Sequence, residues 1–215
     1  MSTARRTQSL ASPDEYLASE RAAFERHECL DGLIYAIAGE SPEHSIINAN
    51  LTIAIGGQLR GKPCTVFSPN MKVYSRLPTD RGLKGLFSYP DVLVVCGQPL
   101  YYDEHRDVVV NPTVVIEVLS KSTESYDRGN KFIRYRQNAS LTDYLLVSQS
   151  HPYVEHFTRR DGGHWEYTFA LGLEGSLYVA SIDSRLQLAE VYDRIDFPDD
   201  ATEDEPDSEA PPVVG

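Results

Sequence analysis

Two acidic residues interrupt stretches of the chain that are otherwise apolar. Residues 90–96 (PDVLVVC) carry Asp91 as their charged residue, and residues 113–119 (TVVIEVL) carry Glu117 among branched aliphatic side chains. Continuous apolar runs of this length are typical of strands that are covered on both faces. A carboxylate in such a strand is costly unless it is paired, hydrogen-bonded or bound to a metal. The pattern therefore predicts a polar site built into two core strands.

Simple strand pairing can bring the two acids together. Asp91 begins its strand and Glu117 lies near the end of the other. Antiparallel neighbours place those two ends side by side. Two carboxylates there form an oxygen-rich site suited to Mg²⁺ or Mn²⁺, and the backbone carbonyl of Val118 could supply a third oxygen. The alternative is that Asp91 only caps the strand entry and that Glu117 pairs with an arginine.

A lysine commonly accompanies such a site, because it can orient an attacking water or neutralise charge that develops on a phosphate. The next position on the face of Glu117 is Leu119, which is apolar. A helix predicted from residue 122 or 123 to 138 offers a substitute, since Asp127, Lys131 and Tyr135 share one stripe of it. We expect Lys131 to point into the site. The alternative is an exposed ion pair between Asp127 and Lys131.

Two residues nearer the N-terminus are further candidates. His44 lies in the first turn of a predicted helix, on the same face as Ile47, Leu51 and Ile55, so it points inward. It is expected either as a base or phosphate contact at the mouth of the site, or as a core histidine with its own partners. Glu28, in the preceding hairpin, is either a further acid of the same pocket or an exposed strand carboxylate.

The remaining pattern alternates helices and strands. Capping residues and prolines begin helices at 12–25 and at 41, and Asp31-Gly32 predicts a hairpin within 28–37. Glycines at 56, 57 and 61 are expected to end the second helix. Further strands are predicted at 64–74, 91–96, 113–119 and 143–148, a meander at 154–157 and 165–169, and a closing helix or turn at 186–192. The order predicts an α+β fold, with a mixed central β-sheet flanked by helices and an added β-meander.

Charge divides the chain into two parts. The formal net charge is −12, and residues 198–215 hold seven acids, four prolines and no base. We therefore predict one domain over residues 1–197 and an acidic, proline-rich, disordered tail over 198–215. The acidic balance disfavours strong non-specific binding to nucleic acid. Residues 121–136 are the exception, with five bases against two acids.

Cysteine usage and hydropathy bear on the compartment. Cys29, Cys64 and Cys96 are an odd number without a Cys-x-x-Cys pair, which argues against a disulfide framework or a zinc ribbon. A reducing cytoplasm is the expected location. No stretch approaches the roughly 18 consecutive apolar residues of a membrane span. The polar N-terminus lacks the apolar core of a secretory signal.

Several separated blocks of the sequence, taken in order, resemble a known family. They are HECLDG (27–32), AIAG (36–39) followed by His44, FSPNMKV (67–73), YPDV (89–92), EVLS (117–120), Ser122-Thr123, Asp127, Lys131, Tyr135 and DYLLV (143–147). The chain resembles the Uma-type restriction endonucleases over about residues 12–197. That family belongs to the PD-(D/E)XK nuclease superfamily. The resemblance therefore implies a restriction-endonuclease-like core and a metal-dependent phosphodiesterase site.

The resemblance also implies roles for single residues. Asp91 corresponds to the motif aspartate and Glu117 to the glutamate of the second half. Lys131 corresponds to a lysine displaced onto the following helix, and His44 to the family histidine. Asn70 stands where many relatives carry aspartate, so an accessory acid is replaced there.

These observations favour an Mg²⁺-dependent endonuclease, with Mn²⁺ as a substitute ion and DNA as the substrate. Asp91, Glu117, Lys131 and His44 are the expected catalytic residues, and Glu28, Asn70, Asp127 and Tyr135 are the expected accessory ones. A homodimer is a further expectation, since nucleases that cut both strands often pair two sites. Two other function classes stay open: a catalytically inactive binding module, and a protein-interaction scaffold that works through the acidic tail.

Overall fold

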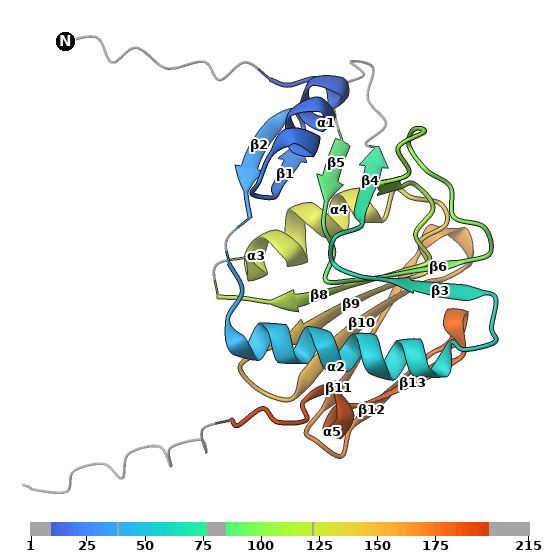
Figure 1. Ribbon diagram of the computed structural model, residues 1–215. Helices are drawn as coiled ribbons and strands as arrows, with labels where there is room; N and C mark the ends of the chain where they lie inside the picture. The colour runs from blue at the N-terminus through green and yellow to red at the C-terminus, as the bar shows by residue number, and fades with distance from the viewer. Residues whose placement is uncertain (1–9, 38, 77–84, 122, 198–215) are drawn as a thin grey trace, which may run out of the picture.

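A computed structural model describes residues 10–37, 39–76, 85–121 and 123–197 (Figure 1). Within these residues a large mixed sheet forms the centre of the fold, in the order β11-β10-β9-β8-β6-β3. Its neighbouring strands are antiparallel except for the parallel pair β8 and β9. Its strands are β3 (Cys64–Phe67), β6 (Val92–Cys96), β8 (Val114–Leu119), β9 (Asp143–Ser148), β10 (Tyr153–Arg159) and β11 (Trp165–Leu171).

A second, smaller sheet lies above the large one in Figure 1, in the order β2-β1-β5-β4-β7. Its strands are β1 (His27–Leu30), β2 (Leu33–Ala36), β4 (Lys72–Arg76), β5 (Gly85–Ser88) and β7 (Val108–Val109). The predicted hairpin turn at Asp31-Gly32 joins β1 to β2, and both turn residues have positive φ, as such a two-residue turn requires. A two-stranded ribbon of β12 (Ser176–Val179) and β13 (Ser184–Gln187) packs at the other end of the molecule.

The helices flank these sheets, as predicted. They are α1 (Pro13–Ala22), α2 (Pro42–Gln58), α3 (Glu124–Tyr126), α4 (Phe132–Tyr135) and α5 (Leu188–Val191), with a π-helical turn at Asp127–Lys131 between α3 and α4 and 3-10 turns at Asp161–Gly163 and Ala180–Ile182. Ser12 and Ser41 cap α1 and α2 through their side chains, each followed by proline in the first turn. The described part of the chain holds no helix that is long and apolar enough to cross a membrane.

The large sheet is covered on both faces, which explains the continuous apolar runs in β6 and β8. On one face, α2 contributes Ile47, Leu51 and Ile55 to a core with alternate residues of β6 and β8. On the other face, the intervening residues of both strands pack with α4 and with the small sheet. Glu117 lies between Val115 and Leu119 in the alternation of β8, so it belongs to this second face. The side chain of Glu117 therefore lies on the face of the large sheet that packs against α4 and the small sheet.

The segment 64–74, predicted as one strand, is two strands in two different sheets. β3 ends at Phe67 and β4 begins at Lys72, with a turn closed by a hydrogen bond from the Met71 N–H to the Ser68 carbonyl at 3.1 Å. The turn contains Pro69 and Asn70, which favour turns and cannot continue a strand ladder well. The prediction of a single strand was wrong because apolar residues on both sides concealed this turn.

The odd cysteine count argued against a disulfide framework, but it did not predict the one disulfide in the described residues. Cys64 and Cys96 form a disulfide, and Cys29 is free and buried. The two bonded cysteines are direct partners in the antiparallel pairing of β3 with β6, with Cα atoms 3.9 Å apart. Spacing along the chain gives no sign of this register. The cysteine count therefore no longer supports a reducing cytoplasm.

The other predicted elements agree with the structure to within a few residues. The β-meander is present as β9-β10-β11, with its second turn at Asp161–Gly163. Helix α2 runs through Gly56 and Gly57 to Gln58, and Gly61 follows it with positive φ. The predicted closing helix at 186–192 is the end of β13 followed by α5. The predicted tail, residues 198–215, lies outside the described residues.

Candidate active site

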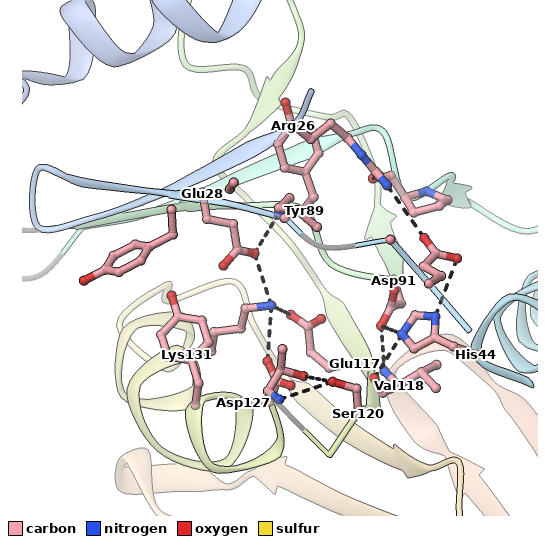
Figure 2. Close-up of a pocket in the computed structure, with 18 of the residues that line it drawn as sticks. Arg26, Glu28, His44, Tyr89, Asp91, Glu117, Val118, Ser120, Asp127 and Lys131 are labelled. Atoms are coloured by element: carbon pink, nitrogen blue, oxygen red, sulfur yellow. Dashed lines mark hydrogen bonds and ion pairs between the residues drawn. The ribbon is translucent and has the colours of Figure 1, made fainter. Parts of the chain in front are cut away.

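A cavity of about 590 Å³ opens at the end of the large sheet, beneath the β1–β2 hairpin. Most of its lining comes from the hairpin, the start of α2, the entry to β6, the end of β8, and the segment from α3 to the π-helical turn, and Pro69 and Gln149 add to it (Figure 2). Its lining includes Glu28, His44, Asp91, Glu117, Val118, Asp127 and Lys131. Most of the residues that the sequence singled out therefore meet at one cavity. Their catalytic roles stay predictions.

The predicted pairing of the two acidic strands is confirmed. β6 and β8 are antiparallel, with Val92 opposite Ile116, which sets Asp91 beside Glu117 at the sheet end. Oδ2 of Asp91 accepts a hydrogen bond from the backbone N–H of Val118 at 2.7 Å, and Oδ1 accepts a longer one from the Asn48 side chain at 3.4 Å. The bond to the Val118 N–H is the kind of strand-end contact that the alternative for Asp91 expected. The alternative for Glu117 expected an arginine partner, but its partners are Lys131 and Tyr135.

Lys131 lies at the centre of a buried ion cluster. Its Nζ is 3.1 Å from Glu28, 3.3 Å from Glu117 and 3.2 Å from Asp127, measured to one carboxylate oxygen of each. Lys131 is 7% exposed and Asp127 only 2%, so the alternative of an exposed ion pair is wrong. The prediction that Lys131 points toward Glu117 is confirmed. Glu28 is buried too, so the alternative in which it is an exposed strand carboxylate is wrong.

Tyr135 completes the surroundings of Glu117. Its hydroxyl donates to Oε1 of Glu117 at 2.9 Å and is also hydrogen-bonded to the Ser88 hydroxyl at 2.8 Å. Asp127, Lys131 and Tyr135 thus reach the same region, although they span a π-helical turn and a short α-helix rather than one regular helix. Single π-helical turns inside α-helical segments occur frequently at functional sites, because they change which side chains share a face.

The protonation behaviour of this cluster follows from its burial. Burial raises the pKa of Glu117 well above its usual value, against the opposing effect of the Lys131 ammonium. Burial likewise raises the pKa of Asp127, again opposed by Lys131. Burial acts to lower the pKa of Lys131 itself, but Glu117 and Glu28 raise it by more, and it lies well above its usual value. The cluster therefore holds a charged lysine and more acids than that single charge neutralises.

His44 is buried, as its helix position predicted, and it contacts both strands. Its Nε2 lies 3.1 Å from the carbonyl oxygen of Val118 and 3.3 Å from Oδ2 of Asp91. Burial acts to lower the pKa of His44, but the neighbouring Asp91 carboxylate raises it, and the net direction is upward. The Val118 carbonyl, expected as a metal ligand, is thus in contact with the imidazole. The expected role of His44 as a base or phosphate contact stays a prediction.

Asn70 and Tyr135 are the two candidates outside the cavity lining; Tyr135 still contacts Glu117, whereas Asn70 lies further away from the acids. It is exposed, outside the cavity lining, and its side-chain oxygen is 3.4 Å from Nη1 of Arg26. Arg26 does line the cavity, so Asn70 contacts the site through this arginine. An accessory role for Asn70 stays a prediction.

Sequence reasoning missed three residues of the cavity wall. Glu40 lies just before the cap of α2, with Oε2 3.6 Å from Nδ1 of His44. The Tyr126 ring lies beneath the Lys131 ammonium, 5.6 Å from the ring centroid, and Tyr89 lines the opposite wall. The i, i+4 spacing of Glu40 and His44 was the one available signal, but it crosses the start of a helix. Tyr126 flanks motif residues without a spacing pattern of its own, and Tyr89 begins the YPDV block but was not predicted as a site residue.

Comparison with known proteins gives consistent results. Residues 13–189 match the family Uma2, described as "Putative restriction endonuclease". Two proteins of Synechocystis sp. are similar in sequence. The uncharacterized protein slr1290 is 36% identical over 159 residues, covering 72% of this chain and 77% of the relative. The uncharacterized protein sll1609 is 30% identical over 166 residues, covering 77% and 90%.

A solved structure shares the fold. The crystal structure of a "putative nuclease belonging to DUF820" from Anabaena variabilis superposes with a TM-score of 0.65 at 15% identity, covering 83% of this chain and 96% of that one. The predicted nuclease-like α+β fold is thereby confirmed.

Proposed function

Because the chain belongs to the Uma2 family of "putative restriction endonucleases", we propose that it is a metal-dependent endonuclease that hydrolyses phosphodiester bonds of DNA. The observation that carries this proposal is the convergence of Asp91, Glu117 and Lys131 at one cavity, from two strands and a helix. Two carboxylates and a lysine beside a solvent-accessible cavity are the groups that metal-assisted phosphodiester hydrolysis requires. A cytoplasmic location is included in this proposal.

The donor set fits a divalent cation. Glu28, Asp91, Glu117 and Asp127 bring four carboxylates to a cavity that Lys131 neutralises only in part. We assign Asp91 and Glu117 as the residues that would hold Mg²⁺, with Mn²⁺ as a substitute, because hard cations take carboxylate oxygens. When bound, such a cation polarises the scissile phosphate and lowers the pKa of a coordinated water.

The chain's own residues would position the substrate. Lys131 would orient the attacking water or neutralise charge on the phosphate, exchanging one of its three carboxylate contacts for the substrate. Tyr135 holds Glu117 through the hydroxyl, and Asp127 and Glu28 hold the lysine in place. The Val118 N–H holds Asp91 in a fixed direction. The site is therefore organised before any substrate enters.

The test is cleavage of supercoiled plasmid and of a labelled single strand by the purified full chain, in Mg²⁺ and then in Mn²⁺. Cleavage is expected in the wild type, and it should be lost in Glu117→Gln and with a chelator. Glu174→Gln, a substitution at an exposed acid, is the matched control and should cleave normally. Absence of cleavage by a folded wild type on any nucleic acid offered, or cleavage that survives Glu117→Gln, would overturn the proposal.

A second candidate function is a non-catalytic DNA-binding module on the same fold. The observation in its favour is that Glu117 already pairs with the Lys131 ammonium and accepts a hydrogen bond from Tyr135. This module would bind DNA equally well with Glu117→Gln and in chelator. The scaffold hypothesis instead requires loss of function when the chain is cut after Phe197. The expected homodimer would be refuted by a monomer mass in sedimentation.

A further inference from the structure

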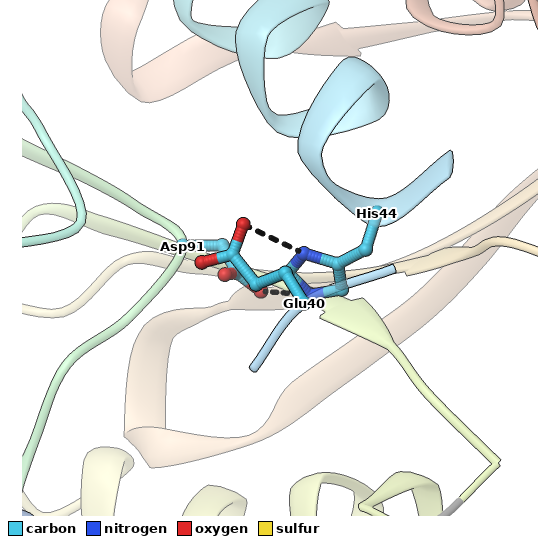
Figure 3. A group of neighbouring side chains, drawn as sticks. All are labelled: Glu40, His44 and Asp91. Atoms are coloured by element: carbon cyan, nitrogen blue, oxygen red, sulfur yellow. Dashed lines mark ion pairs between the residues drawn. The ribbon is translucent and has the colours of Figure 1, made fainter. Parts of the chain in front are cut away.

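A second group of possible ligands lies on the α2 side of the cavity. Glu40, His44 and Asp91 each offer one ligating atom, and these atoms lie within 4.8 Å of one another (Figure 3). The three residues come from the loop before α2, from its first turn, and from the entry to β6. The group shares Asp91 with the site proposed above, but Lys131 is not a member.

The hydrogen bond of His44 leaves one ring nitrogen available. Nε2 faces the carbonyl oxygen of Val118, which can only accept, so Nε2 carries the proton in the neutral ring. The lone pair is then on Nδ1, which is buried and has no hydrogen-bond partner, in a residue that is only 9% exposed. A bond from the second ring nitrogen to a backbone carbonyl is the usual arrangement that orients a metal-binding histidine.

The contact between His44 and Glu40 is too long to satisfy Nδ1. The distance to Oε2 is 3.6 Å, whereas charge-assisted hydrogen bonds measure about 2.7–2.9 Å. The contact of Nε2 with Oδ2 of Asp91, at 3.3 Å, is also longer than that range. A closed chain of acid, imidazole and acid would be shorter at both steps. The three ligating atoms therefore lie within 4.8 Å of one another without short hydrogen bonds between them, a spacing that an ion can bridge.

Each carboxylate is also anchored from outside the group. Asp91 accepts from the Val118 N–H and from Asn48, and these bonds fix its direction. Arg26 approaches Oε1 of Glu40 at 3.7 Å, which leaves Oε2 on the side of the imidazole. The charged groups that face the site are thus Glu40, Asp91 and Arg26, and the acids outnumber the base.

We infer that Glu40, His44 and Asp91 form a second cation site, which takes a divalent transition-metal ion and prefers Mn²⁺ to Mg²⁺. The preference follows from the imidazole, because a nitrogen ligand suits transition ions better than it suits the hard Mg²⁺. The inferred site is distinct from the Asp91–Glu117 site, because it takes Glu40 and His44 in place of Glu117, which is paired with Lys131. The inference concerns ion binding and does not rest on phosphodiester hydrolysis.

The test is Mn²⁺ binding to the metal-free full chain, followed by electron paramagnetic resonance. Glu40→Gln should weaken binding of the first ion by at least about tenfold, given that even outer-shell substitutions commonly cost 10- to 100-fold. Pulsed measurements should show nitrogen coupling to the bound Mn²⁺ in the wild type, and His44→Gln should abolish it. Mg²⁺ should compete only at a concentration at least about tenfold higher.

Two variants serve as controls. Glu43→Gln changes an exposed acid next to His44 on the same helix and should bind Mn²⁺ like the wild type. Glu117→Gln is the second variant, and it separates the two sites: Mn²⁺ binding that depends on Glu117 and not on Glu40 belongs to the Asp91–Glu117 site. Because Glu40 is in an exposed position, Glu40→Gln keeps the test informative even if His44→Gln does not fold.

Three results would overturn the inference: no Mn²⁺ binding to the folded wild type, bound Mn²⁺ without nitrogen coupling, or binding weakened by Glu117→Gln and unchanged by Glu40→Gln. The third would place the ion at Asp91 and Glu117 and leave the nuclease proposal intact. Nitrogen-coupled Mn²⁺ binding without any cleavage would support the inference while refuting the nuclease. The two proposals therefore fail separately.

Discussion

Replacing Lys131 by methionine tests how strongly the buried ion cluster stabilises the fold. Methionine keeps most of the side-chain length and removes the charge. Glu28, Glu117 and Asp127 then lose their shared cation, and all three are buried. Removing one partner of a buried ion pair costs about 3–5 kcal/mol, because an uncompensated charge is left behind. For a chain of 215 residues that is a fall in Tm of roughly 6–20 °C.

The stability lost in Lys131→Met should depend on pH, and the pKa of Glu117 sets the direction of that dependence. Burial raises the pKa of Glu117 and Lys131 lowers it, so the substitution raises this pKa further. An acid whose pKa is higher in the folded state binds more protons there than in the unfolded chain. Stability then falls as pH rises from the unfolded pKa toward the folded one. The deficit of Lys131→Met should therefore grow from pH 5.5 to pH 8, by at most about 1.4 kcal/mol per pH unit.

Urea denaturation in chelator, at both pH values, measures these free energies of unfolding. Lys121→Met, at an exposed lysine, is the matched control and should change stability by less than about 0.5 kcal/mol. Adding Glu117→Gln to Lys131→Met should recover a substantial part of the loss, since one stranded carboxylate is removed. A loss below about 1 kcal/mol, or a deficit that is equal at both pH values, would refute the reasoning.

Three further perturbations follow from other contacts. Tyr135→Phe removes a buried hydrogen bond to Glu117 and should cost about 1.5–3 kcal/mol in urea denaturation; an unchanged midpoint would contradict it. Reduction of the Cys64–Cys96 disulfide opens a loop with a sequence separation of 32 and should cost about 3–4 kcal/mol, measured as a fall in Tm that Cys64→Ser reproduces. Asp107, whose basic partners hold its pKa well below the usual range, stabilises the fold above its unfolded pKa and less as pH falls; Asp107→Asn should therefore flatten the acid limb of the stability curve.

The central part of the site could be predicted because its signals are local. A carboxylate within an apolar strand is visible in a short window, and the pairing of strand ends follows from antiparallel geometry. Asp91, Glu117 and the inward position of His44 were found in this way. The helical stripe also led to Lys131, even though the segment contains a π-helical turn. The prediction for Lys131 needed only that residues four apart, such as Asp127 and Lys131, stay close, and they do so in the π-helical turn.

The features that sequence reasoning missed depend on contacts between distant segments. The disulfide needs the register of β3 against β6, which no spacing reveals. The division of residues 64–74 between two sheets depends on which partner strand each half finds. Glu40 is exposed in a loop and acquires meaning only when α2 brings His44 beside Asp91. Each of these was decided by tertiary structure rather than by local pattern.

The ion cluster has a consequence for how this family could change over time. Glu28 comes from the small sheet, Glu117 from the large sheet, and Lys131 from the segment between them, so their contacts join the two layers. Selection for folding would therefore preserve these residues even in a relative that has no nuclease activity. Retention of the acid and the lysine in a relative marks an intact fold, and it is not by itself a record of catalysis. We expect a lineage that loses Lys131 to lose Glu117 as well, because Glu117 would otherwise be left buried without its cation.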